Sequence, residues 1–212
     1  SGNKEINCSM TKVDLTASGG NTYKWSTGEN SNTISVINSD RYFVTAFAEN
    51  GCSSTASVSV SQNTTIPTVS ITSSANELTC QNSIISLSAN GADSYDWTNG
   101  EMEVTTPGTY TVIGYNGNGC QAIASVEITK NVEGPKVTIR PSADKLTCDV
   151  TAITLQASGA DTYNWDGGKL VVTNSGTYTV TGTNNNGCSA TASVEITQNV
   201  EGPKVTIRPS AD

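Results

Sequence analysis

The sequence repeats one pattern of cysteine, tryptophan and tyrosine three times, and this repetition points to an array of small domains. The middle copy starts at Cys80, continues through Tyr95-Asp96-Trp97 and Gly108-Thr109-Tyr110, and ends at Asn118-Gly119-Cys120. Cys80 and Cys148 are 68 residues apart, which is a period expected of a domain repeated in tandem. A domain of about 70 residues buries little apolar surface, so it commonly depends on a covalent cross-link.

Alternating apolar and polar residues predict strands along the whole chain. In Ala124-Ser125-Val126-Glu127-Ile128-Thr129 the apolar side chains fall on one face of a strand, and residues 192–197 repeat the pattern. No segment has a helical period long enough to predict a helix, so the predicted fold class is all-β. Asn-Gly pairs at 50–51, 118–119 and 186–187 separate two alternating segments, and this dipeptide favours a type I′ hairpin turn with positive φ angles.

The six cysteines are predicted to form one disulfide bond within each repeat. The predicted pairs are Cys8–Cys52, Cys80–Cys120 and Cys148–Cys188. Each bond would close a loop of about 40 residues and, in the chain-entropy model, contribute about 4 kcal/mol. The alternatives are free buried thiols or metal ligands, but the chain has no histidine and no Cys-x-x-Cys to support a zinc site. Disulfides form in oxidising compartments, so we expect an extracellular or cell-surface location.

Each repeat is predicted to fold as an immunoglobulin-like β-sandwich of about seven short strands. We expect Thr68–Thr72 to be the first strand of the second repeat and the last two strands to form a hairpin. In antibody domains the second cysteine follows the corner tyrosine closely in one strand, whereas Cys120 lies ten residues after Tyr110. The bond would therefore hold one end of the sandwich. The predicted core anchors are the aromatic residues of the repeated pattern: Trp25, Trp97, Trp165, Tyr42, Tyr110 and Tyr178.

The repeats divide the 212 residues into four predicted segments. The first repeat spans residues 1–63 and lacks its first strand, the second spans 64–131, and the third spans 132–199. Residues 200–212 are expected to be the first strand of a following repeat, because Asn131–Asp144 and Asn199–Asp212 are identical. One interpretation is a window of a longer array, which we favour. The other is head-to-tail self-assembly, in which the tail of one molecule completes the first repeat of the next by strand addition.

The residue content offers little for catalysis. Without histidine the chain lacks the commonest general base, and it has no glycine-rich phosphate-binding motif, so we predict no enzyme activity, no catalytic residue and no cofactor. Neighbouring carboxylates resemble those of glycosidases or calcium sites, but we interpret them as solvated turn residues, and we predict no metal site. The pairs are Asp93 with Asp96, Asp161 with Asp166, and Glu101 with Glu103.

Charge and hydropathy exclude two classes of partner. The formal net charge is −8, which argues against nucleic acid and anionic membrane surfaces, because both attract basic proteins. No apolar run approaches the length of a membrane span, so we expect no membrane insertion. The least repetitive segments follow the tryptophans, at 26–41, 98–109 and 166–177. If the repeats bind a surface glycan or protein, we expect the differences in binding to reside there.

The repeated motifs resemble those of very large surface proteins of Bacteroidota. The strings Gly176-Thr177-Tyr178-Thr179-Val180 and Asn186-Gly187-Cys188 are similar to SprB-type gliding-motility adhesin repeats and related PKD-like modules. This resemblance covers nearly the whole chain. It implies surface display after export by the type IX secretion system, and a role as an adhesin, filament or stalk.

Three functions are consistent with the sequence. The leading hypothesis is a structural and adhesive one, in which tandem immunoglobulin-like domains form a stalk or filament and neighbouring repeats are the main partners. The second is a ligand-binding module that recognises glycan or protein through the variable loops after each tryptophan. The third is a spacer of a secreted enzyme.

Overall fold

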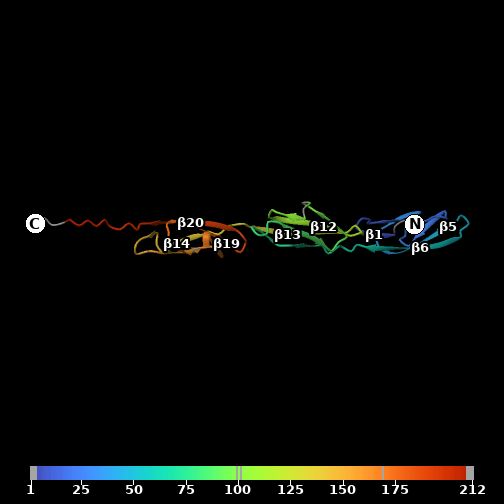
Figure 1. Ribbon diagram of the computed structural model, residues 1–212. Coiled ribbons are helices and arrows are strands. Elements are labelled where there is room, and N and C mark those ends of the chain that lie inside the picture. The colour runs from blue at the N-terminus through green and yellow to red at the C-terminus, as the bar shows by residue number, and fades with distance from the viewer. Residues whose placement is uncertain (1–3, 99, 101, 169, 209–212) are drawn as a thin grey trace. The chain divides into compact units, whose positions relative to one another are not determined.

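The protein is almost entirely β-structure, as the sequence predicted (Figure 1). The computed structural model describes residues 4–98, 100, 102–168 and 170–208. Within these residues the regular elements are twenty strands and one short 3₁₀ turn, η1 at Asp166–Gly168. The all-β class and the sandwich-like sheets are therefore confirmed.

The first repeat forms two sheets. Its strands are β1 (Glu5–Asn7), β2 (Val13–Thr16), β3 (Thr22–Trp25), β4 (Thr33–Val36), β5 (Asp40–Phe47) and β6 (Ser53–Asn63). One sheet has the order β1-β6-β5-β3, and the other is the pair β2-β4. β5 and β6 form the predicted hairpin, in which Phe47 lies opposite Ser53 and Asp40 opposite Val60.

The second and third repeats add one strand at their beginning. The second contains β7 (Ser70–Ser73), β8 (Glu77–Thr79), β9 (Ile85–Asn90), β10 (Ser94–Trp97), β11 (Glu103–Val104), β12 (Gly108–Tyr115) and β13 (Gln121–Asn131). The third contains β14 (Thr138–Pro141), β15 (Lys145–Leu146), β16 (Ile153–Ser158), β17 (Thr162–Trp165), β18 (Val171–Val172), β19 (Gly176–Thr183) and β20 (Ser189–Gln198). The sheets are β10-β12-β13-β8 with β11-β9-β7, and β15-β20-β19-β17 with β14-β16-β18.

A short parallel strand pair recurs in every repeat and determines where the first cysteine lies. β1 runs parallel to the end of β6, with Glu5 beside Ser61 and Asn7 beside Asn63. β8 pairs in the same way with the end of β13, and β15 with the end of β20. Since Cys8, Cys80 and Cys148 follow these short strands directly, each lies near the last residues of its own repeat.

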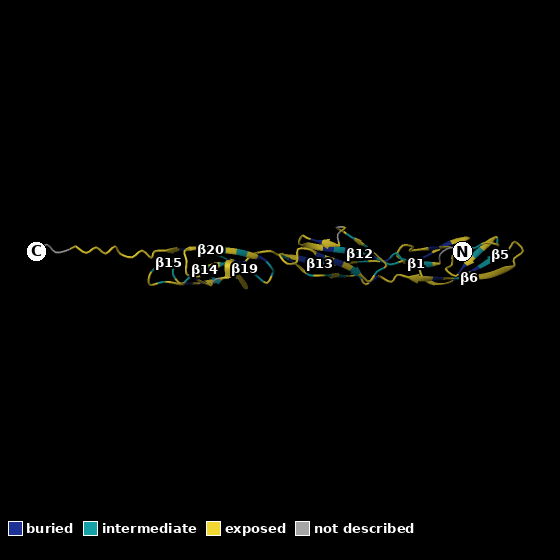
Figure 2. Cartoon of the chain, in the orientation of Figure 1, coloured by how far each residue is buried: buried dark blue, intermediate teal, exposed yellow. Residues whose placement is uncertain are grey.

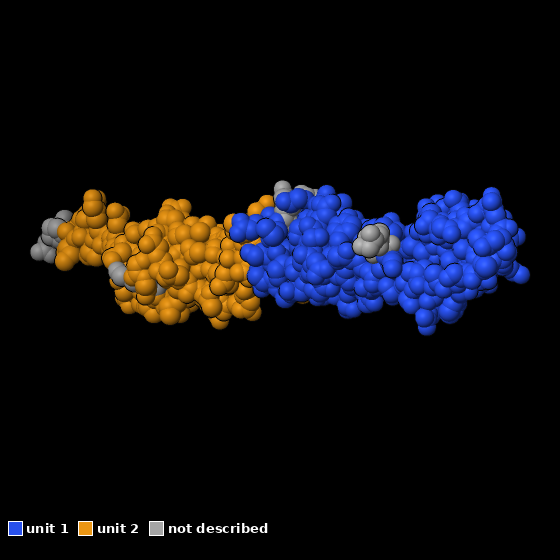
Figure 3. Space-filling model, turned by 90° about the vertical axis from the view of Figure 1, so that its right-hand side faces the viewer, with its two compact units in different colours: residues 1–74, 86–104, 108–127 blue, residues 75–85, 105–107, 128–212 orange. Residues whose placement is uncertain are grey.

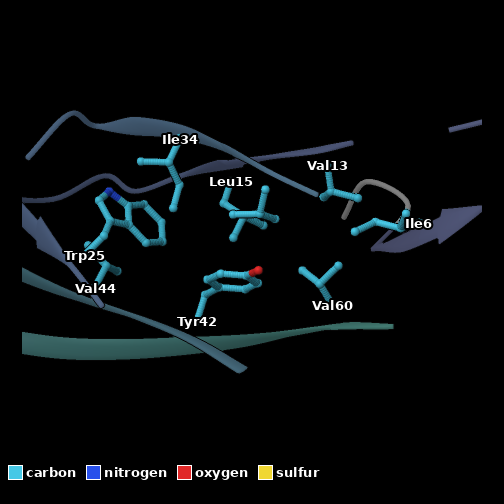
Figure 4. Close-up of a cluster of buried hydrophobic side chains, with 9 residues drawn as sticks. Ile6, Val13, Leu15, Trp25, Ile34, Tyr42, Val44 and Val60 are labelled. Carbon is cyan, nitrogen blue, oxygen red and sulfur yellow. The ribbon is translucent and has the colours of Figure 1, made fainter. Parts of the chain in front are cut away.

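The core of the first repeat is made by the inward-facing half of each strand (Figure 4). Burial alternates along β2 and β4, as the period of two in a half-buried strand requires. Trp25 is buried and its indole Nε1 donates a hydrogen bond to the Ser31 carbonyl oxygen at 2.8 Å. The buried side chains are Ile6, Val13, Leu15, Trp25, Ile34, Val36, Tyr42, Val44 and Val60.

The predicted core anchors differ in how deeply they are buried. Trp25, Tyr42 and Tyr110 are buried, whereas Trp97, Trp165 and Tyr178 are half-buried. The hydroxyl groups of Tyr42 and Tyr178 each donate to a backbone carbonyl four residues upstream, at 2.8 Å. Burial, followed by the charge of Asp40, raises the pKa of Tyr42. The tyrosines thus tie their strands to the preceding turns.

The hairpin loops differ from the predicted type I′ turns. No described residue other than glycine has a positive φ, so the asparagines cannot be in a type I′ turn. Instead the Gly119 N–H donates to Asn116 O at 2.9 Å, and Asn116 N–H donates to Cys120 O at 2.9 Å. This is the three-residue hairpin loop, in which only the glycine adopts the left-handed conformation (φ 77° at Gly119).

Two compact units divide the described chain (Figure 3). Unit 1 comprises residues 1–74, 86–104 and 108–127, and unit 2 comprises residues 75–85, 105–107 and 128–212. The boundary between the two units passes through the second repeat. The sheets, by contrast, are each made of strands from a single repeat. The boundaries 1–63, 64–131 and 132–199 remain predictions.

Residues 200–208 follow β20 without forming a strand and are exposed (Figure 2). Their counterparts in the third repeat include β14, which pairs with β16. The prediction that residues 200–212 begin a following repeat is therefore not tested by this structure, and residues 209–212 lie outside the described residues.

The alternating burial of β13 predicts a large difference between two isoleucines of one strand. Ile128 is 1% exposed and Ile123 is 63% exposed. Ile128→Ala should lower the free energy of unfolding by about 2–5 kcal/mol, because it leaves a cavity, whereas Ile123→Ala should change it by about 0.5 kcal/mol or less. Urea unfolding of both variants measures the difference. Equal losses would contradict the inward orientation of Ile128.

Candidate functional site: disulfide-linked repeat junctions

The disulfide bonds link consecutive repeats. Cys8 bonds to Cys120 and Cys80 bonds to Cys188, with Cα–Cα distances of 4.9 Å and 5.0 Å. Cys52 and Cys148 are free and exposed. The predicted pairs Cys8–Cys52, Cys80–Cys120 and Cys148–Cys188 are therefore wrong, as is the expectation of one bond within each repeat.

The short parallel strand explains why bonds within a repeat do not form. Cys8 follows β1, whose last residue lies beside Asn63 at the end of β6, whereas Cys52 precedes the start of β6. β6 is 11 residues long. At about 3.3 Å per residue the two cysteines are separated by roughly 35 Å of strand, while a disulfide needs Cα atoms within about 7 Å. The same separation holds for Cys80 and Cys120 along β13.

The first cysteine of the first and of the second repeat instead bonds to a cysteine at the hairpin loop of the repeat that follows. The two bonds span 112 and 108 residues, and their loops overlap because Cys80 lies between Cys8 and Cys120 in the chain. In the chain-entropy model a loop of this size contributes about 5 kcal/mol, slightly more than the predicted 40-residue loops would. Because the two disulfide loops share residues 80–120, the bond between the first and second repeats and the bond between the second and third repeats constrain the same segment.

Glycine is required where the hairpin loop rests on the preceding repeat. A Cβ atom on Gly119 would overlap the Ser9 side chain, and one on Gly187 would lie 2.8 Å from Gln81 Cβ. The Gln81 N–H also donates to Asn186 O at 3.3 Å. In the first repeat, by contrast, a Cβ on Gly51 meets nothing within 4 Å. The loop backbone therefore packs directly against the residue after the first cysteine.

The loop asparagines bind the linkers between repeats. Asn118 Nδ2 donates to Asn63 Oδ1 at 3.1 Å and to Thr65 O at 3.0 Å. Asn186 Nδ2 makes the equivalent bonds, to Asn131 Oδ1 at 3.2 Å and to Glu133 O at 3.1 Å. The side-chain oxygen of each asparagine accepts a hydrogen bond from the following cysteine N–H at 3.0 Å. One side chain thus shapes the loop and holds the linker.

These contacts bury one of the two cysteines of each disulfide bond. Cys120 is 1% exposed and Cys188 is 2% exposed, whereas Cys8 and Cys80 are exposed. Cys52, at the same position of the first repeat, is exposed. Because thiol–disulfide exchange requires access to a sulfur atom, burial of one partner leaves only the exposed cysteine of the bond open to attack.

Sequence reasoning missed the partners of the hairpin loop. Ser9, Gln81, Asn63 and Asn131 were not identified as junction residues. A periodic signal existed for two of them, since an asparagine recurs at 63, 131 and 199. It carried no meaning on its own, because the sequence does not show that the loop of one repeat reaches the end of the previous one.

One carboxylate in each of two predicted pairs accepts a hydrogen bond from the hairpin loop of its own repeat. Asp93 Oδ2 accepts a hydrogen bond from Gly117 N–H at 2.8 Å, and Asp161 Oδ2 accepts one from Asn185 N–H at 2.8 Å. Asp96, Asp166 and Glu103 are exposed, and Glu101 lies outside the described residues. Within the described part of the chain, no group of three His, Cys, Asp or Glu side chains is arranged to hold a metal ion. Nor do the described residues include a helix with the length and hydropathy of a membrane span.

Comparisons with known proteins show the fold. No family model and no curated protein matches the chain. A Ca²⁺-stabilised adhesin with which an Antarctic bacterium binds ice is 17% identical, with a TM-score of 0.51 over 94% of this chain and 72% of that one. A structure of a 1.5-MDa bacterial ice-binding adhesin is 16% identical, with a TM-score of 0.52 over 93% of this chain and 95% of that one. At these identities the chain shares an architecture of β-domains with both.

The packing of Gly119 against Ser9 can be tested with a matched pair of variants, because Gly51 occupies the same loop position without such a contact. Gly51→Ala and Gly119→Ala both place a side chain at positive φ, which costs about 1–2 kcal/mol. Only Gly119→Ala also meets Ser9. We expect Cys8 and Cys120 of the Gly119→Ala variant to react with an alkylating reagent in the native protein. In the Gly51→Ala variant only Cys52 and Cys148, which form no bond, should react. Peptide mapping after alkylation distinguishes them, and identical maps would contradict the packing of Gly119 on Ser9.

Proposed function

We propose that the chain is a load-bearing part of an extracellular adhesive stalk, in which disulfide bonds join each repeat to the next. The observation that carries this proposal is the overlap of Cys8–Cys120 and Cys80–Cys188. Bonds within repeats would stabilise each domain alone. Bonds between repeats provide a covalent path that bypasses most of the chain. Such a path limits how far the chain can extend when a force pulls on its two ends.

The bypass follows from the order of the cysteines. The shortest covalent path from one end to the other crosses from Cys8 to Cys120, runs back to Cys80, and crosses again to Cys188. This path contains about 70 of the 212 residues. Residues 9–79 and 121–187 lie outside it, so unfolding of the first or the third repeat cannot lengthen the oxidised chain beyond that path.

The architecture shared with two adhesins supports a stalk, as does the resemblance to SprB-type repeats of Bacteroidota. One of those adhesins is described as Ca²⁺-stabilised. In this chain the junctions are held by disulfides and by asparagine–linker hydrogen bonds, and we propose that these contacts stabilise the chain without calcium. Export by the type IX system, display at the cell surface and the absence of enzyme activity belong to the same proposal.

A second candidate function is ligand binding through the variable segments after the tryptophans. These segments expose large apolar side chains: Ile37 is 66% exposed, Met102 62% and Leu170 55%. In the first repeat the Arg41 guanidinium carbon also lies 5.2 Å from the centre of the exposed Phe43 ring. Such surfaces suit a glycan or protein ligand. A third candidate, a spacer of a secreted enzyme, would use the same stalk.

Single-molecule force spectroscopy tests the covalent bypass. With handles at both ends, reduction should lengthen the fully unfolded chain by about 140 residues, or roughly 480 Å. Cys8→Ser, which keeps only Cys80–Cys188, should show an intermediate length. Cys52→Ser should match the unaltered protein, since Cys52 forms no bond. An oxidised chain that extends as far as the reduced one would contradict the proposal.

A glycan array distinguishes the stalk from the ligand-binding module. If the chain is a stalk, the oxidised protein binds no glycan above the background set by a denatured sample. If it is a binding module, it binds a defined glycan class, and Met102→Ser or Leu170→Ser weakens binding while the exposed control Ile123→Ser does not, because only the first two lie after a tryptophan. Specific binding lost in this way would overturn the pure stalk.

A further inference from the structure

The four-stranded sheet of the first repeat carries positive charge on its outer face. Lys24 on β3 and Arg41 on β5 are exposed, and each directly precedes a buried aromatic residue. Successive side chains of a strand point to opposite sides of a sheet, so both cations face solvent. The other outward residues of β3, β5 and the paired part of β6 are two phenylalanines and several serines and threonines. This face is therefore cationic, although the net charge of the chain is −8.

Two exposed phenylalanines make the same face apolar as well. Phe43 is 42% exposed and Phe47 is 36% exposed. The Arg41 guanidinium carbon lies 5.2 Å from the centre of the Phe43 ring, and Arg41 Nη2 donates a hydrogen bond to Ser57 Oγ at 3.0 Å. The guanidinium is thus held against the ring by a cation–π contact and stays at the surface. We call four of these residues the cationic face: Lys24, Arg41, Phe43 and Phe47.

The second repeat carries the opposite charge on the corresponding sheet. Asp96 takes the position of Lys24, since each directly precedes the tryptophan of its repeat. Asp96 is exposed and lies beside Ile113 of β12. On β13 Glu127 is exposed, and Ile123 is 63% exposed. The outward residues of β10, β12 and β13 therefore combine two carboxylates with two isoleucines.

These outward residues of β12 and β13 lie on one side of the sheet. Thr111 Oγ1 and Ser125 Oγ are 3.0 Å apart, which places both hydroxyl groups on the same face. Ile113 is two residues from Thr111, and Ile123 and Glu127 are each two residues from Ser125, so they share that face. We call four residues of this surface the anionic face: Asp96, Ile113, Ile123 and Glu127.

Neighbouring repeats leave this sheet face open. The second repeat has a repeat on each side of it in the chain, and Ile123 is nevertheless 63% exposed. The third repeat presents the same face with different residues, because Thr181 and Thr191 take the positions of the two isoleucines and lie opposite each other. The charged outward residue of its strands β17, β19 and the paired part of β20 is Glu195. The cationic and anionic faces are therefore specific to the first and second repeats.

The charges on the two faces have similar spacing. On the cationic face Lys24 is one strand across and four residues along from Arg41, which separates their Cα atoms by roughly 14 Å. On the anionic face Asp96 is two strands across and four residues along from Glu127, in the register that the third repeat also has. This separates their Cα atoms by roughly 16 Å. Two pairs of opposite charges can thus form at once when the faces meet.

We propose that the cationic face of one copy of the chain binds the anionic face of a second copy, so that two stalks associate side by side. Face-to-face packing of the sheets places the phenylalanines on the isoleucines, while Lys24 and Arg41 each meet a carboxylate. Because each copy carries both faces, the contact can be repeated from copy to copy.

The size of the two faces predicts a weak contact. Three strands of about seven residues present roughly 300 Å² on each face. The total of roughly 650 Å² is less than the about 1,000 Å² expected of a stable interface. A single contact therefore forms only at high protein concentration, and several contacts between the same associated stalks strengthen one another.

Sedimentation equilibrium of the oxidised 212-residue protein tests this contact. The free thiols are alkylated first, so that no new disulfide bond forms. We expect the average mass to rise above the monomer mass as the protein concentration increases, and to return toward it in 1 M salt, which screens the charge pairs. Arg41→Glu and Glu127→Lys should each weaken the association about tenfold, because each places like charges together. Ile123→Ser should weaken it by removing an apolar contact.

A mixture of two variants separates this contact from other modes of association. Arg41→Glu alters only the cationic face and Glu127→Lys only the anionic face, so the mixture contains one intact copy of each. Mixing the two variants should therefore restore association at the same total protein concentration. Glu195→Lys is the matched control, because Glu195 is the counterpart of Glu127 on the third repeat and has threonines in place of the isoleucines. It should leave the association unchanged.

Several results would overturn the proposal. These are a protein that stays monomeric at every concentration, association that survives Arg41→Glu, a mixture of variants that does not associate, and equal effects of Glu195→Lys and Glu127→Lys. Polygalacturonate that binds the cationic face of a protein without self-association would also overturn it, because the partner is then an acidic polysaccharide. The force measurement uses single molecules whose disulfide bonds these surface variants leave intact, so the association and the load-bearing role fail separately.

Discussion

The parallel pairing of one short strand with the end of the last strand determines how each repeat joins its neighbour. Because β1 runs beside the end of β6, and β8 beside the end of β13, the first cysteine emerges at the far end of its own repeat. Pairing with the first residues of β6 or β13 would instead have placed it near the hairpin loop and allowed a bond within the repeat. The covalent linkage between repeats therefore follows from the register of a strand of three residues.

The position of the cross-link suits the small size of the domains. Each core has few large side chains, and a core of this size supplies only a few kcal/mol of net stability. A bond across a junction limits the unfolded state of both repeats, since the loop it closes includes residues of each. The hydrogen bonds to the linker and the disulfide bond lie at the same place in each junction, because the asparagine that binds the linker is two residues before the buried cysteine. The stability of one repeat is thus coupled to that of the next, as in other repeat arrays.

Much of the fold could be predicted from the sequence, because alternation along a strand is a local signal. The hairpin strands and the burial of Trp25 and Tyr42 follow from such patterns. The disulfide pairing could not be predicted in this way. It depends on the pairing of Asn7 with Asn63, which is a register between distant segments. The turn type was also misjudged, because an Asn-Gly pair suits both the two-residue and the three-residue loop, and Asn118 is held by the linker, not by its own φ.

The repetition has one more physical consequence, which concerns the redox state. In each closed junction one cysteine is buried beneath the loop of the following repeat and its partner is exposed. In the first repeat no described residue packs on the same loop: Cys52 is exposed, and no described atom lies within 4 Å of a Cβ on Gly51. Burial of the cysteine is therefore a result of joining two repeats, not a property of one repeat. In a closed junction a reducing thiol can therefore approach the bond only through its exposed cysteine, so the packing of the loop directs attack to Cys8 and Cys80.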